Sequence, residues 1–269
     1  MAIRVYLDTN IIARIKEGKL STDLISKKLG TDKIEYFYSD EHIRETQAIK
    51  YYAPSKEDGI KWVNQQLRVI SQICDNNYLT FDLKGNIVTF KKLPLLRFLQ
   101  IKDYATEEMI KSGFQDNMPN EIRKIYRQIF DFSPQELTNI APNKILDLLD
   151  KKFIERQSKA SEDYQKKWGN KLKDLEQNYF QQMGGVVNNY EKLAGIFLLL
   201  DLCGYWKDAE TEKSDFARMY DSSHANWATY SDYFISNDKK TRMKTEVGYH
   251  YLNTCYNADI KTQVIELNP

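Results

Sequence analysis

The chain has 269 residues, of which 42% are hydrophobic, so it is long enough to bury a substantial core. Its formal net charge of +1 does not mark the whole molecule as a binder of polyanions, and its mean hydropathy of -0.62 is typical of a well-solvated, helix-rich globular protein. Three widely spaced cysteines, Cys74, Cys203 and Cys255, argue against a disulfide framework and a thiolate zinc site, and favour a reducing, cytoplasmic location.

The beginning of the chain alternates between strand and helix patterns. Residues 3–7 predict a strand, and the apolar residues that follow are spaced as on one face of a helix. The start of the chain has no signal-peptide pattern. Residues 33–40 predict a second strand, which leads into a helix that Ser39 or Asp40 caps. This alternation favours a parallel sheet covered by helices.

The middle of the chain, residues 55–214, is dominated by long, charged, amphipathic helix patterns broken by proline and glycine. Residues 78–90 form two alternating runs around "KGN" and predict a β-hairpin. Residues 148–183 indicate one long solvated helix or a helical hairpin. The most apolar segment, 193–206, predicts a buried helix, because it is too short to span a bilayer; we therefore expect no membrane partner.

The strand pattern returns near the end of the chain, at residues 232–238 and 261–267. A sheet assembled from both ends of the sequence predicts one discontinuous α/β domain. We expect this domain to comprise residues 1–54 and 215–269, with residues 55–214 as a large, mostly α-helical insertion.

Acidic side chains lie where the predicted strands end. Asp8 follows the first strand and Asp238 follows a late strand, so neighbouring strands would bring the two carboxylates together. Glu45 and Asp221 lie on the adjoining predicted helices. Such carboxylates repel one another unless a cation neutralises them, and oxygen ligands suit Mg²⁺ or Mn²⁺. Asn10 follows Asp8 by two residues.

Three motifs carry a resemblance to a known family. They are "LDTN" with Asp8 and Asn10, "SDEHIRET" with Glu45, and "DSSHANWATYSDYFISNDKKTR" with Asp221, His224 and Asp238. In this order the chain resembles the PIN-domain nuclease superfamily over roughly residues 1–50 and 215–268. The helical insertion is far longer than the corresponding connection in compact members of that family.

The resemblance implies a PIN-like central parallel sheet flanked by helices and an Mg²⁺- or Mn²⁺-dependent endonuclease, most often an endoribonuclease. Water activated by the metal would hydrolyse the phosphodiester bond. Carried over by position, the catalytic and metal-binding residues would be Asp8, Glu45, Asp221 and Asp238. Asn10 would steer either Asp8 or a metal-bound water. The expected partners are single-stranded or structured RNA, an inhibitor or accessory protein, and a second copy of the chain.

Several residues keep two interpretations. Asp40 and Glu41 are alternatives to Glu45. His224 either contacts a phosphate or a metal-bound water, or it packs as a structural residue, which is the interpretation we favour. The basic residues after Asp238 are either a solvated face or contacts to backbone phosphates; they are Lys239, Lys240, Arg242 and Lys244. The competing hypothesis for the whole chain is a catalytically inactive PIN-like module that binds a protein or nucleic acid.

Overall fold

The computed structural model describes residues 2–101, 137–157, 188–206 and 212–267. The chain forms two compact units. Unit 1 comprises Met1–Phe114, Ser223–Arg242 and Lys261–Pro269, and unit 2 comprises Gln115–Ser222 and Met243–Ile260. None of the described helices is long and apolar enough to cross a membrane.

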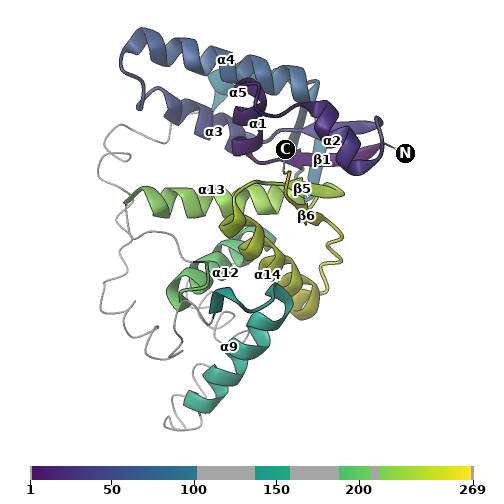
Figure 1. The fold of residues 1–269 in the computed structure, drawn as a ribbon, viewed down its shortest axis with the longest axis vertical. Coiled ribbons are helices and arrows are strands. Elements are labelled where there is room, and N and C mark those ends of the chain that lie inside the picture. The colour runs from purple at the N-terminus through teal and green to yellow at the C-terminus, as the bar shows by residue number, and fades with distance from the viewer. Residues whose placement is uncertain (1, 102–136, 158–187, 207–211, 268–269) are drawn as a thin grey trace. The chain divides into compact units, whose positions relative to one another are not determined.

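Unit 1 is built on a four-stranded sheet in which every strand pair is parallel. Its strands in spatial order are β2 (Ile34–Phe37), β1 (Ile3–Leu7), β5 (Tyr233–Ile235) and β6 (Gln263–Ile265). In Figure 1 the yellow-green β5 and β6 lie beside the purple β1, although they come from opposite ends of the sequence. The predicted α/β fold with a parallel sheet closed by late-chain strands is therefore confirmed.

Side-chain alternation along β1 divides the core of unit 1 into two clusters. Val5 and Leu7 pack on one face of the sheet with Ile11 and Ile12. Tyr6 points to the opposite face and packs with an aromatic group; its buried neighbours are Phe37, Leu79, Trp227, Ala228 and Phe234. This alternation buries the Tyr6 hydroxyl, which contacts the buried polar residues Ser39 and His224.

The described part of unit 1 contains five helices before residue 102. They are α1 (Thr9–Lys16), α2 (Thr22–Leu29), α3 (Asp40–Ile49), α4 (Lys56–Cys74) and α5 (Pro94–Gln100). A serine side chain caps the start of three of them, α2, α3 and α4. Ser39 caps α3, as the sequence predicts, by accepting a hydrogen bond from the Glu41 amide. Helix α2 ends at Gly30, whose φ of 69° suits glycine because it has no Cβ. Helices α3 and α4 pack together, as do α1 and α4.

The predicted hairpin is confirmed as β3 (Asn77–Phe81) paired antiparallel with β4 (Ile87–Lys91). Gly85 takes a positive φ of 80° in the connecting turn. Tyr78 forms a parallel bridge with Tyr38 beyond the end of β2, so the hairpin adjoins the main sheet. Helix α4 contacts β2 and α3, β3 contacts β2, and α5 contacts α3 and α4, so these elements belong to unit 1. The helical insertion over residues 55–214 stays a prediction.

Unit 2 is helical where it is described. Its elements are α9 (Pro142–Gln157), α12 (Asn189–Cys203), the first part of α13 (Glu212–Ala228) and most of α14 (Lys239–Tyr256). Helix α12 confirms the predicted buried helix, since Leu193, Phe197 and Leu200 are fully enclosed or nearly so. Residues 148–157 of the other predicted helix lie in α9, and the remainder of that prediction, 158–183, lies outside the described residues.

A buried ion pair joins two of these helices. The ammonium of Lys244 on α14 lies 2.5 Å from the carboxylate of Asp201 on α12. The two side chains are 0% and 6% exposed. Each of these two buried charges needs its partner, because an unpaired charge in the interior would lose its hydration without compensation.

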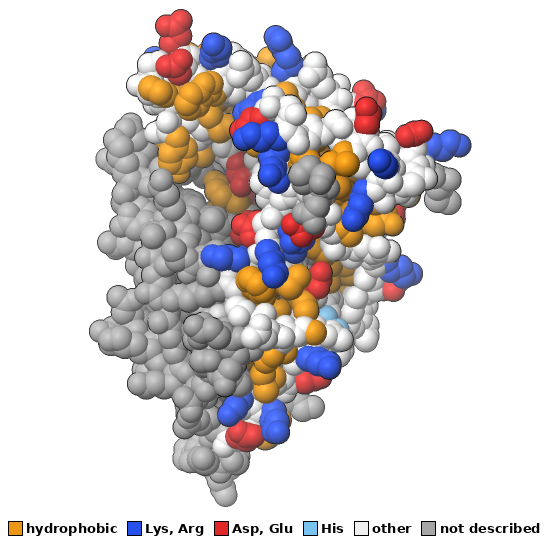
Figure 2. All heavy atoms as spheres, in the orientation of Figure 1, with side chains coloured by type: hydrophobic (Ala, Val, Ile, Leu, Met, Phe, Trp, Pro, Cys, Tyr) orange, Lys and Arg blue, Asp and Glu red, His pale blue; other side chains and the backbone are white. Residues whose placement is uncertain are grey.

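The described surface carries both signs of charge. Basic and acidic side chains are interspersed over the face shown in Figure 2, in line with the net charge of +1. A polyanionic ligand would therefore meet charges of both signs on this face.

Candidate functional site

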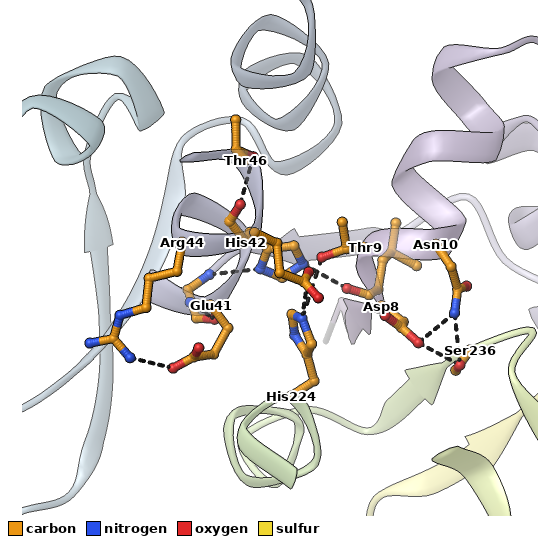
Figure 3. A network of polar contacts seen from close by, with 12 residues as sticks. Asp8, Thr9, Asn10, Glu41, His42, Arg44, Thr46, His224 and Ser236 are labelled. Atoms are coloured by element: carbon orange, nitrogen blue, oxygen red, sulfur yellow. Dashed lines mark hydrogen bonds and ion pairs between the residues drawn. The ribbon is translucent and has the colours of Figure 1, made fainter. Parts of the chain in front are cut away.

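The carboxylate of Asp8 lies at the end of β1 and is only 5% exposed. The pairing of Leu7 with Ile235 sets Ser236, the next residue on the neighbouring strand, opposite Asp8. Asp8 Oδ2 accepts hydrogen bonds of 2.6 Å from the Ser236 hydroxyl and 2.6 Å from the Asn10 amide (Figure 3). Asn10 therefore orients Asp8, as the sequence predicts, and Ser236 shares that role.

Asp238 lies two residues beyond Ser236 and starts a helix. Its backbone amide donates to Ser236 Oγ at 3.1 Å, while its carboxylate accepts hydrogen bonds from the amides of Lys240 and Thr241. It is thus the capping residue of α14 and is exposed to solvent. Because β5 ends at Ile235, Ser236 rather than Asp238 is the direct neighbour of Asp8.

Glu45 faces the buried imidazole of His224. Glu45 Oε2 lies 3.0 Å from His224 Nε2, and Thr9 Oγ1 lies 3.3 Å from the same nitrogen. The His224 side chain is 1% exposed and that of Glu45 is 25% exposed. Since a carboxylate can only accept, His224 Nε2 carries the proton in this contact. Helix α3 and the C-terminal end of α13 are thereby joined at the edge of the sheet.

The other nitrogen of His224 meets the hydroxyl of Tyr6. The distance from Tyr6 Oη to His224 Nδ1 is 2.8 Å, and that from Tyr6 Oη to Ser39 Oγ is 2.6 Å. The Ser39 amide donates to His42 Nδ1, and His42 Nε2 donates to the Leu7 carbonyl at 2.8 Å. These contacts form one buried polar network that links β1, α3 and α13.

Glu41 is a second buried acid on α3. It is 4% exposed, and Oε1 accepts a hydrogen bond of 2.9 Å from Arg44. Its other oxygen, Oε2, is buried without a hydrogen-bond partner in the described structure. Glu41 precedes Glu45 by four residues, a spacing that puts both on the same side of a helix.

The electrostatics of these groups follow from burial and mutual charge. Burial raises the pKa of Asp8, with Glu45 adding to the rise and His224 opposing it. Burial likewise raises the pKa of Glu41 against the lowering by Arg44 and His224. Burial alone would lower the pKa of His224, but Glu45, Asp8 and Glu41 together raise it to about 9. The negative charges of three carboxylates therefore favour the protonated form of His224.

We expect stability to fall as pH rises above 6.5. The pKa of His224 rises on folding from 6.5 to about 9, so its contribution is fully present below pH 6.5 and is lost as pH rises through about 9. The shift corresponds to about 3 kcal/mol. Urea unfolding monitored by circular dichroism at pH 6.5 to 9.5 measures the effect. The variant His224→Gln should show a much flatter profile, and an equally steep profile in that variant would contradict the assignment.

The remaining predicted site residues lie in different surroundings. Asp221 is half-buried on α13 and belongs to unit 2. Arg242 is 6% exposed, and its guanidinium binds the Ser236 carbonyl and the Glu266 carboxylate. Lys239 is exposed and Lys240 half-buried at the start of α14. These two lysines are the members of the predicted basic cluster that solvent reaches more readily.

The fit of a divalent cation depends on the carboxylates of unit 1. Within the described ranges, no group of three or more His, Cys, Asp or Glu residues is arranged to hold a metal ion. Mg²⁺, however, commonly keeps several waters and uses only one or two protein carboxylates together with substrate phosphates. Asp8 and Glu45 carry carboxylate oxygens, the atom type that Mg²⁺ and Mn²⁺ prefer. The Oε2 atom of Glu41 is buried without a hydrogen-bond partner in the described structure, and a bound cation would satisfy such an atom. The donor chemistry therefore suits Mg²⁺ or Mn²⁺.

Three residues of the site were not predicted from the sequence. Local sequence patterns do not single out Tyr6 or Ser236, and they leave Glu41 as an alternative to Glu45. The available signal for Tyr6 was a phenol within the otherwise aliphatic end of a strand, "VYL". The position of Ser236 beside Asp8 follows only from the register between β1 and β5, which local sequence patterns do not give.

Comparisons with known proteins do not add to these observations. No family model matches the chain, and neither the curated proteins nor the solved structures searched contain a match to it. The fold and the site therefore define an α/β protein with a four-stranded parallel sheet and a buried carboxylate and histidine network at its edge.

Proposed function

We propose that the chain is a PIN-like, metal-dependent endonuclease that hydrolyses phosphodiester bonds, with RNA as its main substrate. The observation that carries this proposal is the buried carboxylate of Asp8 at the carboxyl end of a central parallel strand, with Glu45 and Glu41 acting on the same buried histidine. In parallel α/β sheets, ligands bind in the crevice outside this edge. Such an activity fits a reducing, cytoplasmic location.

The chain's own residues have distinct roles in this proposal. Asp8 and Glu45 would hold Mg²⁺ or Mn²⁺, with Asp238 as the further predicted ligand of unit 1, while Asn10 and Ser236 fix the rotamer of Asp8. A bound divalent ion supplies Lewis acidity and lowers the pKa of water near the scissile phosphate. Lys239 and Lys240 would contact backbone phosphates, and these electrostatic contacts would weaken as salt is added.

A cleavage panel tests the function. Purified protein is incubated with single-stranded RNA, hairpin RNA, single-stranded DNA and duplex DNA, each with Mg²⁺, Mn²⁺ or excess chelator. We expect divalent-dependent cleavage of RNA and none with chelator. Cleavage that persists in chelator would contradict the metal mechanism, and preferential cleavage of DNA would contradict the substrate.

A second function has a specific observation in its favour. Three of the candidate metal ligands already have a protein partner. Asp8 accepts a hydrogen bond from Ser236, Glu45 contacts His224, and Asp238 accepts a hydrogen bond from an amide at the start of α14. A PIN-like module that has lost catalysis and binds a protein or nucleic acid would keep such a network for stability. Nucleic-acid binding without cleavage of any panel member would favour this function over the nuclease.

A further inference from the structure

Glu45 is held by a chain of hydrogen bonds that begins on another element. Its carboxylate meets Nε2 of His224, and Nδ1 of His224 meets the hydroxyl of Tyr6 at the centre of the sheet. Tyr6 is fully buried and does not contact Glu45 in any hydrogen bond described above. The His224 imidazole therefore bridges the Tyr6 hydroxyl and the Glu45 carboxylate.

The imidazole is in turn confined on several sides. Its ring lies 5.7 Å from the ring of Tyr6 and 4.8 Å from that of His42. The Tyr6 hydroxyl is itself fixed by Ser39, which caps α3. Tyr6 thus couples the first turn of α3 to His224, which binds Glu45 one turn further along that helix.

We infer that Tyr6 and His224 are positioning residues that fix the carboxylate of Glu45 at the edge of the sheet, with Tyr6 acting through His224. The functional meaning of this arrangement rests on the proposed metal-dependent reaction. Ligating carboxylates are commonly held by such outer partners, whose removal weakens metal binding or activity about 10- to 100-fold. The pair would set one ligand before the metal and the substrate arrive.

The test uses the small number of histidines in the chain. There are three, His42, His224 and His250, so protein labelled with ¹⁵N-histidine gives few ring signals to assign. In the metal-free protein we expect a slowly exchanging Nε2 proton on His224, because that nitrogen is buried and bound to Glu45. Tyr6→Phe, which removes only the hydroxyl, should speed its exchange at least about 10-fold and weaken Mn²⁺ binding about 10-fold.

A matched control removes a different tyrosine hydroxyl. Tyr36 lies on the neighbouring strand β2, and its buried hydroxyl has no hydrogen-bond partner in the described structure. Tyr36→Phe should leave the His224 proton and Mn²⁺ binding unchanged. His224→Gln retains a side-chain donor for Glu45 but cannot also reach Tyr6 as the imidazole does, so it should bind Mn²⁺ more weakly than the wild-type protein.

The outcomes separate this inference from the proposed function. Unchanged exchange of the His224 Nε2 proton in a folded Tyr6→Phe protein would overturn the inference. If exchange accelerates but the wild-type protein binds no Mn²⁺, the positioning stands and the metal-dependent function fails. If Tyr6→Phe does not fold, His224→Gln decides, because undiminished Mn²⁺ affinity in that variant would overturn the inference.

Discussion

Asp8→Asn should lower RNA cleavage at least about 100-fold while leaving the protein folded. The substitution removes the negative charge that would bind the cation. Loss of a metal ligand should lower activity at least as much as loss of a residue that only supports a ligand. Asparagine retains an oxygen that can accept from Ser236 and Asn10, the present partners of Asp8. Initial rates of RNA cleavage under saturating Mn²⁺ measure the effect.

The same substitution makes a specific prediction for stability. Burial raises the pKa of Asp8, which means that the folded protein disfavours its ionised form. We therefore expect the free energy of unfolding of Asp8→Asn to remain within about 1 kcal/mol of the wild-type value. The control is Asp23→Asn, the same chemical change at an exposed position of α2, which should keep full activity. Full activity in Asp8→Asn would contradict the proposed catalytic role.

Lys244→Ala should lower the free energy of unfolding by about 3 to 5 kcal/mol. Lys244 is fully buried against Asp201, so the substitution leaves the interior carboxylate without its cation. Urea denaturation monitored by circular dichroism, with hydrogen exchange on α12 and α14, measures the loss. The exposed Lys151 on α9 is the matched control, and Lys151→Ala should change stability by no more than about 0.5 kcal/mol.

A double substitution tests whether charge pairing is the cause. Lys244→Met combined with Asp201→Leu replaces both charges by apolar groups, and we expect it to recover most of the stability lost in Lys244→Ala. If the double variant is as unstable as the single one, other contacts of these side chains account for the loss.

Much of the architecture is predictable from local patterns. The strand at residues 3–7, the hairpin at 78–90 and the buried helix at 193–206 all occur, because period and composition report which side chains are buried. The division into units is less predictable. Residues 243–260 belong to unit 2 although they follow the third strand of the main sheet in sequence. A helix pattern does not say which neighbours will cover its apolar face.

The sequence by itself determined that Asp8 would end a central parallel strand. It also determined that Asn10 would bind Asp8, because the two residues are close together along the chain. Only the tertiary structure decided that Ser236 would lie opposite Asp8, that Asp238 would cap a helix, and that Tyr6 would reach Glu45 through His224. The physical reason is register: the hydrogen-bonded alignment of β1 with β5 joins residues more than 200 positions apart, and a shift of one residue turns every side chain to the other face.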